Sequence, residues 1–156
     1  MAKPDECQGC LLYDAEGPVF GEGPDNAKMA FIGEAPAGNE VLLRRPFVGG
    51  AGRVLSALLH QADVDRSACF VHNVICCRIP HDKLTEYSPA EEVAKFCSAR
   101  FLEPTLEGMS ALRVVVPMGT AANFAVTGRG KVDAEIYPYQ GYPWTTPIRQ
   151  YVVVPI

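Results

Sequence analysis

The stretch from Gly33 to Gly52 carries an unusual set of side chains for a loop. A carboxylate, Glu34, comes directly after a glycine, and the aromatic ring of Phe47 lies between a proline and two glycines. A carboxylate can orient water or favour a positive charge, and a ring can stack on a planar ligand. A connection that only has to turn has no use for such a ring. We therefore expect a binding or catalytic site here.

Asn73 is a third candidate, because it is an amide within an apolar run at residues 69–80. Left without partners in the protein interior, such an amide costs about 1–3 kcal/mol. It either satisfies neighbouring backbone groups or faces the hydrogen-bonding edge of a ligand. Its one acceptor and two donors suit the edge of a nucleobase, and both interpretations stay open at this point.

Six cysteines supply a second kind of chemistry. Cys7 and Cys10 form a CxxC pair in a polar amino-terminal segment, a spacing shared by zinc, iron–sulfur and redox sites. No charged-then-apolar leader opens the chain, so we expect a cytoplasmic protein whose thiols bind metal or act in catalysis rather than form disulfides. Cys97, taken alone, is typical of a core cysteine on a helix.

The elements around these residues predict the fold. Buried strands are predicted at residues 29–32, 69–80, 113–117 and 151–156. One helix is predicted after Gly52, because an apolar face recurs there at Val54, Leu55, Leu58, Leu59 and Ala62. A second helix is predicted to start at residues 88–91 and to stop at Pro104. A third, short helix is predicted at residues 119–126. We predict an α/β fold over residues 1–156: a single-domain, doubly wound, mostly parallel four-stranded sheet with helices on both faces. Ligand sites of such sheets lie where a strand passes into a helix, as the stretch from Gly33 does.

The charge distribution permits a nucleic-acid partner, although the formal net charge is −4. Residues 1–40 carry eight acidic and two basic side chains, whereas residues 41–156 carry ten acidic and twelve basic ones. The second part can present a local basic face, or its arginines can be ordinary solvated surface. No apolar run approaches the ~20 residues that cross a bilayer, so we expect no membrane partner. We also expect a monomer. The arginines in question are Arg44, Arg45, Arg53 and Arg78.

In this order, the motifs resemble those of the uracil-DNA glycosylase superfamily, most closely family 4, the iron–sulfur type. They are also similar to the related module of phage-type DNA polymerases. The resemblance runs from Cys7 to Ile156. Its motifs are CxxC at Cys7–Cys10, GEGP at Gly21–Pro24, GEAP at Gly33–Pro36, RPFVG at Arg45–Gly49, Asn73 followed by Cys77-Arg78-x-Pro80, and Cys97 on a following helix.

This resemblance implies a DNA repair glycosylase that hydrolyses the N-glycosidic bond of uracil after the base is flipped out of the duplex. It implies that Glu34 is the catalytic carboxylate, that Phe47 stacks on the base and that Asn73 reads its Watson–Crick edge. The backbone N–H groups of Ala35 and Ala37 are expected to face the base. The implied partners are uracil-containing DNA and, in the polymerase-linked form, a DNA polymerase.

The resemblance also implies a 4Fe-4S cluster held by Cys7, Cys10, Cys77 and Cys97, with a structural zinc ion as the alternative. Cys69 and Cys76 are left over. Because neighbours along a strand point to opposite faces, we predict that Cys76 is a buried thiol and not a ligand.

The sequence departs from the family pattern in two places. The first motif continues with Ala37 instead of glycine, and residues 41–43 are apolar where the family is polar. The family's second motif, His-Pro, follows a strand like Val152–Ile156, and no residue follows Ile156 here. Loss of a donor to the leaving uracil would slow the reaction about a hundredfold. The hypotheses are therefore an active glycosylase, a weak or inactive DNA-binding module that works with a polymerase, and a metal-bearing fold with no nucleic-acid role.

Overall fold

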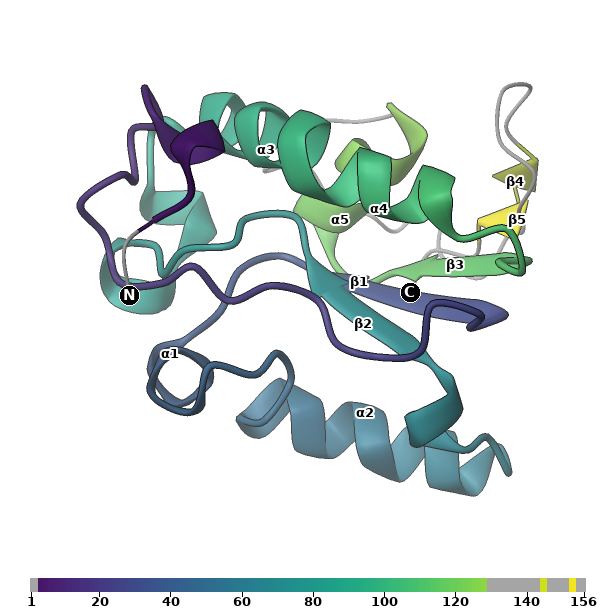
Figure 1. Ribbon diagram of the computed structural model, residues 1–156. Coiled ribbons are helices and arrows are strands. Elements are labelled where there is room, and N and C mark those ends of the chain that lie inside the picture. The colour runs from purple at the N-terminus through teal and green to yellow at the C-terminus, as the bar shows by residue number, and fades with distance from the viewer. Residues whose placement is uncertain (1–2, 129–143, 146–151, 154–156) are drawn as a thin grey trace.

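The computed structural model describes residues 3–128, 144–145 and 152–153, and it has three layers (Figure 1). A sheet lies in the middle. One face is covered by α1 (Gly38–Leu43) and α2 (Gly50–Gln61). The other face is covered by α3 (Ala90–Cys97), α4 (Glu103–Gly108) and α5 (Thr120–Thr127). Helices on both faces of the sheet agree with the predicted α/β class.

The sheet has the strand order β2-β1-β3-β5-β4. β1 (Met29–Gly33) pairs in parallel with β2 (Phe70–Asn73) on one side and with β3 (Val114–Pro117) on the other. β5 (Val152–Val153) is parallel to β3, and β4 (Trp144–Thr145) is antiparallel to β5. The predicted mostly parallel sheet is confirmed, but the described sheet has five strands instead of the predicted four, because β4 adds an antiparallel strand beside β5. Most of the strand predicted at 151–156 lies outside the described residues.

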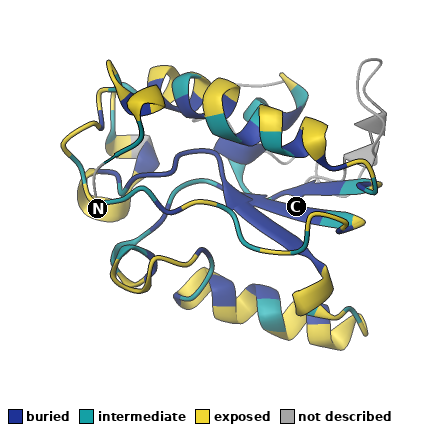
Figure 2. Cartoon of the chain, in the orientation of Figure 1, coloured by how far each residue is buried: buried dark blue, intermediate teal, exposed yellow. Residues whose placement is uncertain are grey.

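Alternation of side chains along the strands divides the core into two clusters. Ala30 and Ile32 of β1 pack toward α3, α4 and α5. Phe31, between them, packs with Leu55 and Leu59 of α2. In Figure 2 the strands are buried at the centre and the outer sides of the helices are exposed. The sheet is therefore covered on both faces, as parallel sheets are.

The helix predictions need two corrections. Val54 and Leu58 do not join Leu55 and Leu59 in the core, because they are 60% and 51% exposed. Pro104 does not end the helical pattern, since it lies in the first turn of α4, where a missing N–H is tolerated. A π-helical turn, η5 (Ser98–Leu102), joins α3 to α4.

The remaining described elements are short, and they connect the sheet to its helices. The amino-terminal segment pairs with β2 through an isolated antiparallel bridge between Glu22 and Val71. Among the described residues, no helix has the length and apolarity that a membrane span requires. The 3-10 turns are η1 (Asp5–Cys7), η2 (Arg66–Ala68), η3 (Pro80–Asp82) and η4 (Leu84–Glu86).

Candidate active site

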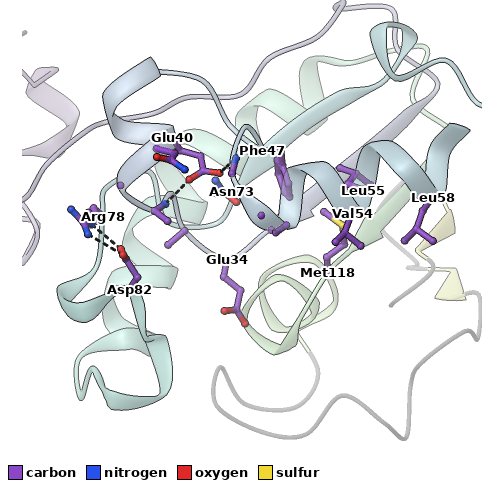
Figure 3. Close-up of a pocket in the computed structure, with 18 residues that line it drawn as sticks. Glu34, Glu40, Phe47, Val54, Leu55, Leu58, Asn73, Arg78, Asp82 and Met118 are labelled. Atoms are coloured by element: carbon purple, nitrogen blue, oxygen red, sulfur yellow. Dashed lines mark hydrogen bonds and ion pairs between the residues drawn. The ribbon is translucent and has the colours of Figure 1, made fainter.

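A pocket of about 810 Å³ lies at the carboxyl ends of β1 and β2 (Figure 3). Its walls come from the loop after β1, the RPFVG stretch, the first turns of α2 and the end of β2. All five residues predicted to contact substrate line this single pocket. They are Glu34, Ala35, Ala37, Phe47 and Asn73.

Gly33 brings the ring of Phe47 and the amide of Asn73 together. The register of the parallel strands places Gly33 opposite Asn73. A Cβ atom on residue 33 would lie 2.5 Å from Asn73 Oδ1 and 2.6 Å from Phe47 Cζ. Both side chains therefore close on the same point of the backbone, and only glycine leaves them room. The result is a slot with an aromatic wall and an amide at its edge.

The Asn73 amide has no partner within the described part of the chain. The residue is only 4% exposed, and its side chain makes no hydrogen bond there. Its backbone carbonyl accepts a hydrogen bond from Nδ1 of His72, whose imidazole pKa is lowered by burial. An amide that borders the pocket and has no partner among the described residues favours the second of the two interpretations, a group that faces a ligand.

Glu34 lies in the same pocket but apart from the slot. Its carboxylate accepts a hydrogen bond from the N–H of Ala121 and stands against Gly119, where a Cβ atom would lie 2.8 Å from Oε1. Figure 3 shows its side chain pointing away from Phe47 and Asn73. Burial raises the pKa of Glu34 above its usual 4.5, and the Ala121 N–H opposes that rise.

The two predicted backbone donors differ in their surroundings. The N–H of Ala37 donates to Glu40 Oε2 at 3.2 Å, so it is already engaged within the protein. Ala37 lines the pocket and stays a predicted substrate contact, with its N–H engaged by Glu40. The N–H of Ala35 makes no hydrogen bond in the part of the chain that the structure describes, and it stays a predicted donor.

The profile of the uracil DNA glycosylase superfamily matches residues 20–155. The chain belongs to this superfamily. This confirms the resemblance inferred from the motifs.

Three curated relatives of this superfamily member are named Type-4 uracil-DNA glycosylase. The protein of Saccharolobus solfataricus is 30% identical over 147 residues, which is 88% of this chain and 65% of the relative. The protein of Thermotoga maritima is 32% identical over 125 residues, which is 80% of this chain and 62% of the relative. The protein of Sulfurisphaera tokodaii is 29% identical over 154 residues, which is 96% of this chain and 67% of the relative. The chain thus spans about two thirds of the length of these relatives.

Five of the six thiols of this glycosylase-superfamily chain interact with one another. Interaction with Cys76, and to a smaller degree with Cys10, lowers the pKa of Cys97 to about 7, although burial opposes that shift. Cys7 and Cys77 also feel the charge of Cys97, and burial raises the pKa of Cys77 to about 11. The sixth, Cys69, is separate and donates to Asp65 O.

The prediction that Cys76 is a buried thiol is confirmed, and its exclusion as a ligand stays a prediction, but the reason given for it is wrong. Strand β2 ends at Asn73, so the alternation of faces does not extend to residues 76 and 77. Cys76 and Cys77 both interact electrostatically with Cys97. Cys76 is buried, as predicted, but it is part of the thiol group.

A metal centre stays a prediction. All six cysteines are free thiols. Although the thiols interact pairwise, no three His, Cys, Asp or Glu side chains in residues 3–128, 144–145 and 152–153 are grouped to hold a metal ion. The donor chemistry still fits an iron–sulfur cluster, because buried thiols from three chain segments meet at Cys97.

The predicted basic face is partly neutralised. Arg45 pairs with Glu22 at 2.6 Å, and Arg78 pairs with Asp82 and Glu16 at 2.7 and 2.8 Å. Arg44 and Arg53 are exposed, and within the described residues neither makes an ion pair. These two therefore remain available to an anionic partner.

The sequence interpretation missed two charged side chains beside the slot. Glu40 is 7% exposed and bonds to two backbone N–H groups. A glutamate three residues after a helix N-cap is a known capping signal, and it could have marked this residue. Arg66 contacts Phe47, Gly52 and Ser56, and the sequence carries no local signal for contacts over such separations.

Proposed function

We propose that this protein is a uracil-DNA glycosylase that hydrolyses the bond between uracil and deoxyribose. The observation that carries the proposal is the slot around Gly33, with the Phe47 ring on one side and, on the other, an Asn73 amide that has no partner among the described residues. The slot suits a single planar base with a polar edge. The names of the curated relatives support uracil as that base.

Recognition follows from the chemistry of the two side chains. Uracil has a carbonyl acceptor beside an N–H donor on its Watson–Crick edge, and one carboxamide can satisfy both at once. Stacking on an aromatic ring contributes about 1–3 kcal/mol per base. Because a base within a duplex cannot reach such a pocket, the nucleotide must first be flipped out.

Glu34 has the properties that the bond-breaking step requires. When the C1′–N1 bond breaks, its electron pair leaves with uracil and positive charge develops on the sugar. An ionised carboxylate stabilises that charge and holds the water whose oxygen then bonds to C1′. The proton that this water loses is accepted by the carboxylate and ends on the uracil anion. Its position in the pocket, away from the base slot, supports a role at the sugar.

The test is excision of uracil from an oligonucleotide with one labelled uracil, followed by alkaline cleavage of abasic sites. Wild-type protein should cut the uracil strand and leave a thymine strand intact. Glu34→Gln should retain binding and lose most of the excision. Equal scission by wild type and Glu34→Gln would remove the basis for Glu34 as the catalytic residue.

We also propose that Cys7, Cys10, Cys77 and Cys97 hold a 4Fe-4S cluster, with zinc as the alternative. Bound there, the cluster would cross-link the amino-terminal segment to the chain after β2 and to α3. The thiol contacts at Cys97 support this assignment. A brown protein that dithionite bleaches indicates iron–sulfur, whereas a colourless protein with one equivalent of zinc indicates the alternative.

The same oligonucleotide separates the second candidate, a module that binds uracil-DNA for a DNA polymerase without turnover. The unpartnered Asn73 amide suits binding as well as catalysis. Tight binding to uracil-DNA without any product would favour this candidate.

A further inference from the structure

Phe47 has a backbone conformation that a bulky residue rarely adopts. Its φ is +56°, in the left-handed region that favours glycine. Such conformations persist where surrounding contacts determine them, and they concentrate at functional sites. In this chain Arg66 bonds to Phe47 itself, and Glu40 bonds to Gly49, two residues further along the same loop.

Arg66 holds the carbonyl of Phe47. Its Nη2 donates to Phe47 O at 3.0 Å, while its Nη1 donates to Gly52 O at 3.2 Å and to Ser56 Oγ at 3.0 Å. The rigid guanidinium thus joins the residue to the first turns of α2. Gly52 completes this packing, since a Cβ atom there would lie 1.8 Å from Phe47 O.

Arg66 does not itself reach the base slot. It is absent from the residues that line the pocket. It can therefore act on a ligand only through the residues that it holds.

Glu40 holds the other side of the same loop. Its Oε1 accepts from the N–H of Gly49 at 2.7 Å, and its Oε2 accepts from the N–H of Ala37 at 3.2 Å. One buried carboxylate therefore joins the GEAP loop to the RPFVG loop, two residues beyond Phe47. Figure 3 shows Glu40 beside Phe47 and Asn73 at the head of the pocket.

We propose that Arg66 and Glu40 are positioning residues that lock the ring of Phe47 in place across from Asn73. The inference rests on the proposed uracil-binding role of this slot. With residue 47 held from both sides, the slot is open before a base arrives, and no ordering of the loop is needed on binding. Loss of either side chain lets residues 44–49 relax and moves the ring away from the amide.

The position of the ring can be measured without any substrate. The chain has seven phenylalanines, which can be labelled as 4-fluorophenylalanine and resolved by 19F NMR. The Phe47 line is the one missing from Phe47→Ala. We expect Arg66→Ala and Glu40→Ala to move or broaden that line and to leave the other lines in place. An unchanged Phe47 line in both variants overturns the proposal.

Single-turnover excision of uracil gives the second readout. Arg66→Ala should slow excision about tenfold to a hundredfold, the cost of misplacing a group by about an ångström. In a Phe47→Ala background the same change should alter the rate by less than about twofold, because its target is already gone. The Glu40→Ala cycle should behave in the same way. If Arg66→Ala or Glu40→Ala slows excision by the same factor in the wild-type and the Phe47→Ala protein, a role through Phe47 is contradicted.

Conservative variants and one matched control complete the test. Arg66→Lys keeps the positive charge but loses the planar guanidinium with its several N–H donors, and Glu40→Gln keeps one oxygen acceptor. The excision rate and the Phe47 line of each variant should therefore lie between those of wild type and of the alanine variant. These two decide the question if the alanine variants fail to fold. Arg113→Ala is the control, because Arg113 also bonds two backbone carbonyls, those of Ser110 and Leu112, but lies before β3, away from the pocket. It should change neither readout.

Failure of the proposed function would look different. If wild type excised no uracil at all, that function would fall, while the 19F spectra would still decide whether Arg66 and Glu40 hold the ring. A displaced ring combined with a wild-type excision rate would remove the functional part of this inference alone.

Discussion

The base slot and the thiol group are built in contrasting ways. The slot stands on Gly33 and Asn73, which the parallel register of β1 and β2 places opposite each other, and its loops are held by Glu40 and Arg66. The thiol group draws Cys7 and Cys10 from a segment with only the short turn η1, and Cys76 and Cys77 from a bend after β2. The slot is arranged by the fold alone, whereas the thiols meet without forming a metal-holding group in the residues described.

This contrast makes the two regions separable by experiment. Changes in the thiol group should alter metal content and stability, and changes in the slot should alter rate and leave the metal in place. The first prediction concerns the thiol at the centre of the group.

Cys97→Ser should have the largest effect. Cys97 interacts with thiols from both other segments, so its loss removes the common point. We expect loss of essentially all bound iron and a fall in Tm of about 10 °C or more, since metal binding at such sites contributes to folding. Iron assay and thermal unfolding measure both. Full iron content in this variant would contradict the assignment of Cys97 as a ligand.

Glu34→Gln should reduce kcat by about a hundredfold to a thousandfold, the range for loss of one preorganised electrostatic group. Iron content and affinity for uracil-DNA should stay as in wild type, because the Glu34 side chain points away from the slot and no thiol affects its pKa. Anisotropy of a labelled oligonucleotide gives the affinity. A loss of iron would show that the two regions are coupled after all.

Gly33→Ala should close the slot without touching the thiols. The added methyl group would lie within 2.6 Å of both Phe47 and Asn73, so one of them must move. Overpacking of this kind costs about 1–3 kcal/mol, and we expect weaker binding of uracil-DNA by about tenfold to a hundredfold. A matched control is Gly108→Ala, where a Cβ atom meets nothing within 4 Å.

The pH dependence of excision should report Glu34. Burial raises its pKa above 4.5, and the ionised form is the proposed active one, so the rate should fall with acid at a pH above that value. Above the raised pKa the buried charge opposes folding, and this penalty disappears as the pH falls through it. Glu34→Gln should therefore lose the acid limb and should not lower Tm at neutral pH. A profile with the same limb in both proteins points to another group.

The smallest effect is expected from Cys76→Ser. The motif pattern assigns the ligand role to Cys77, yet Cys76 also interacts with Cys97 within the same thiol group. We expect iron content near that of wild type in Cys76→Ser and strongly reduced iron in Cys77→Ser. The reverse result would exchange the two assignments.

Most of the site was predictable because its parts are local motifs. Glu34, Phe47 and Asn73 follow from a carboxylate after a glycine, a ring in a glycine-rich turn and an amide in an apolar run, and all three line one pocket. The errors have equally local causes. The alternation of strand faces ends with β2 at Asn73, and Pro104 begins α4 instead of ending a helix.

The sequence by itself determined the α/β class, the superfamily and the chemical groups of the slot, because apolar periodicity and short motifs are properties of neighbouring residues. Only the tertiary structure decided that the Ala37 N–H is engaged by Glu40, that Cys76 joins the thiols and that Arg66 holds Phe47. Those facts depend on where separate segments meet. Arg66 and Phe47 are 19 positions apart, and only packing of α2 and η2 against the loop brings them within 3.0 Å.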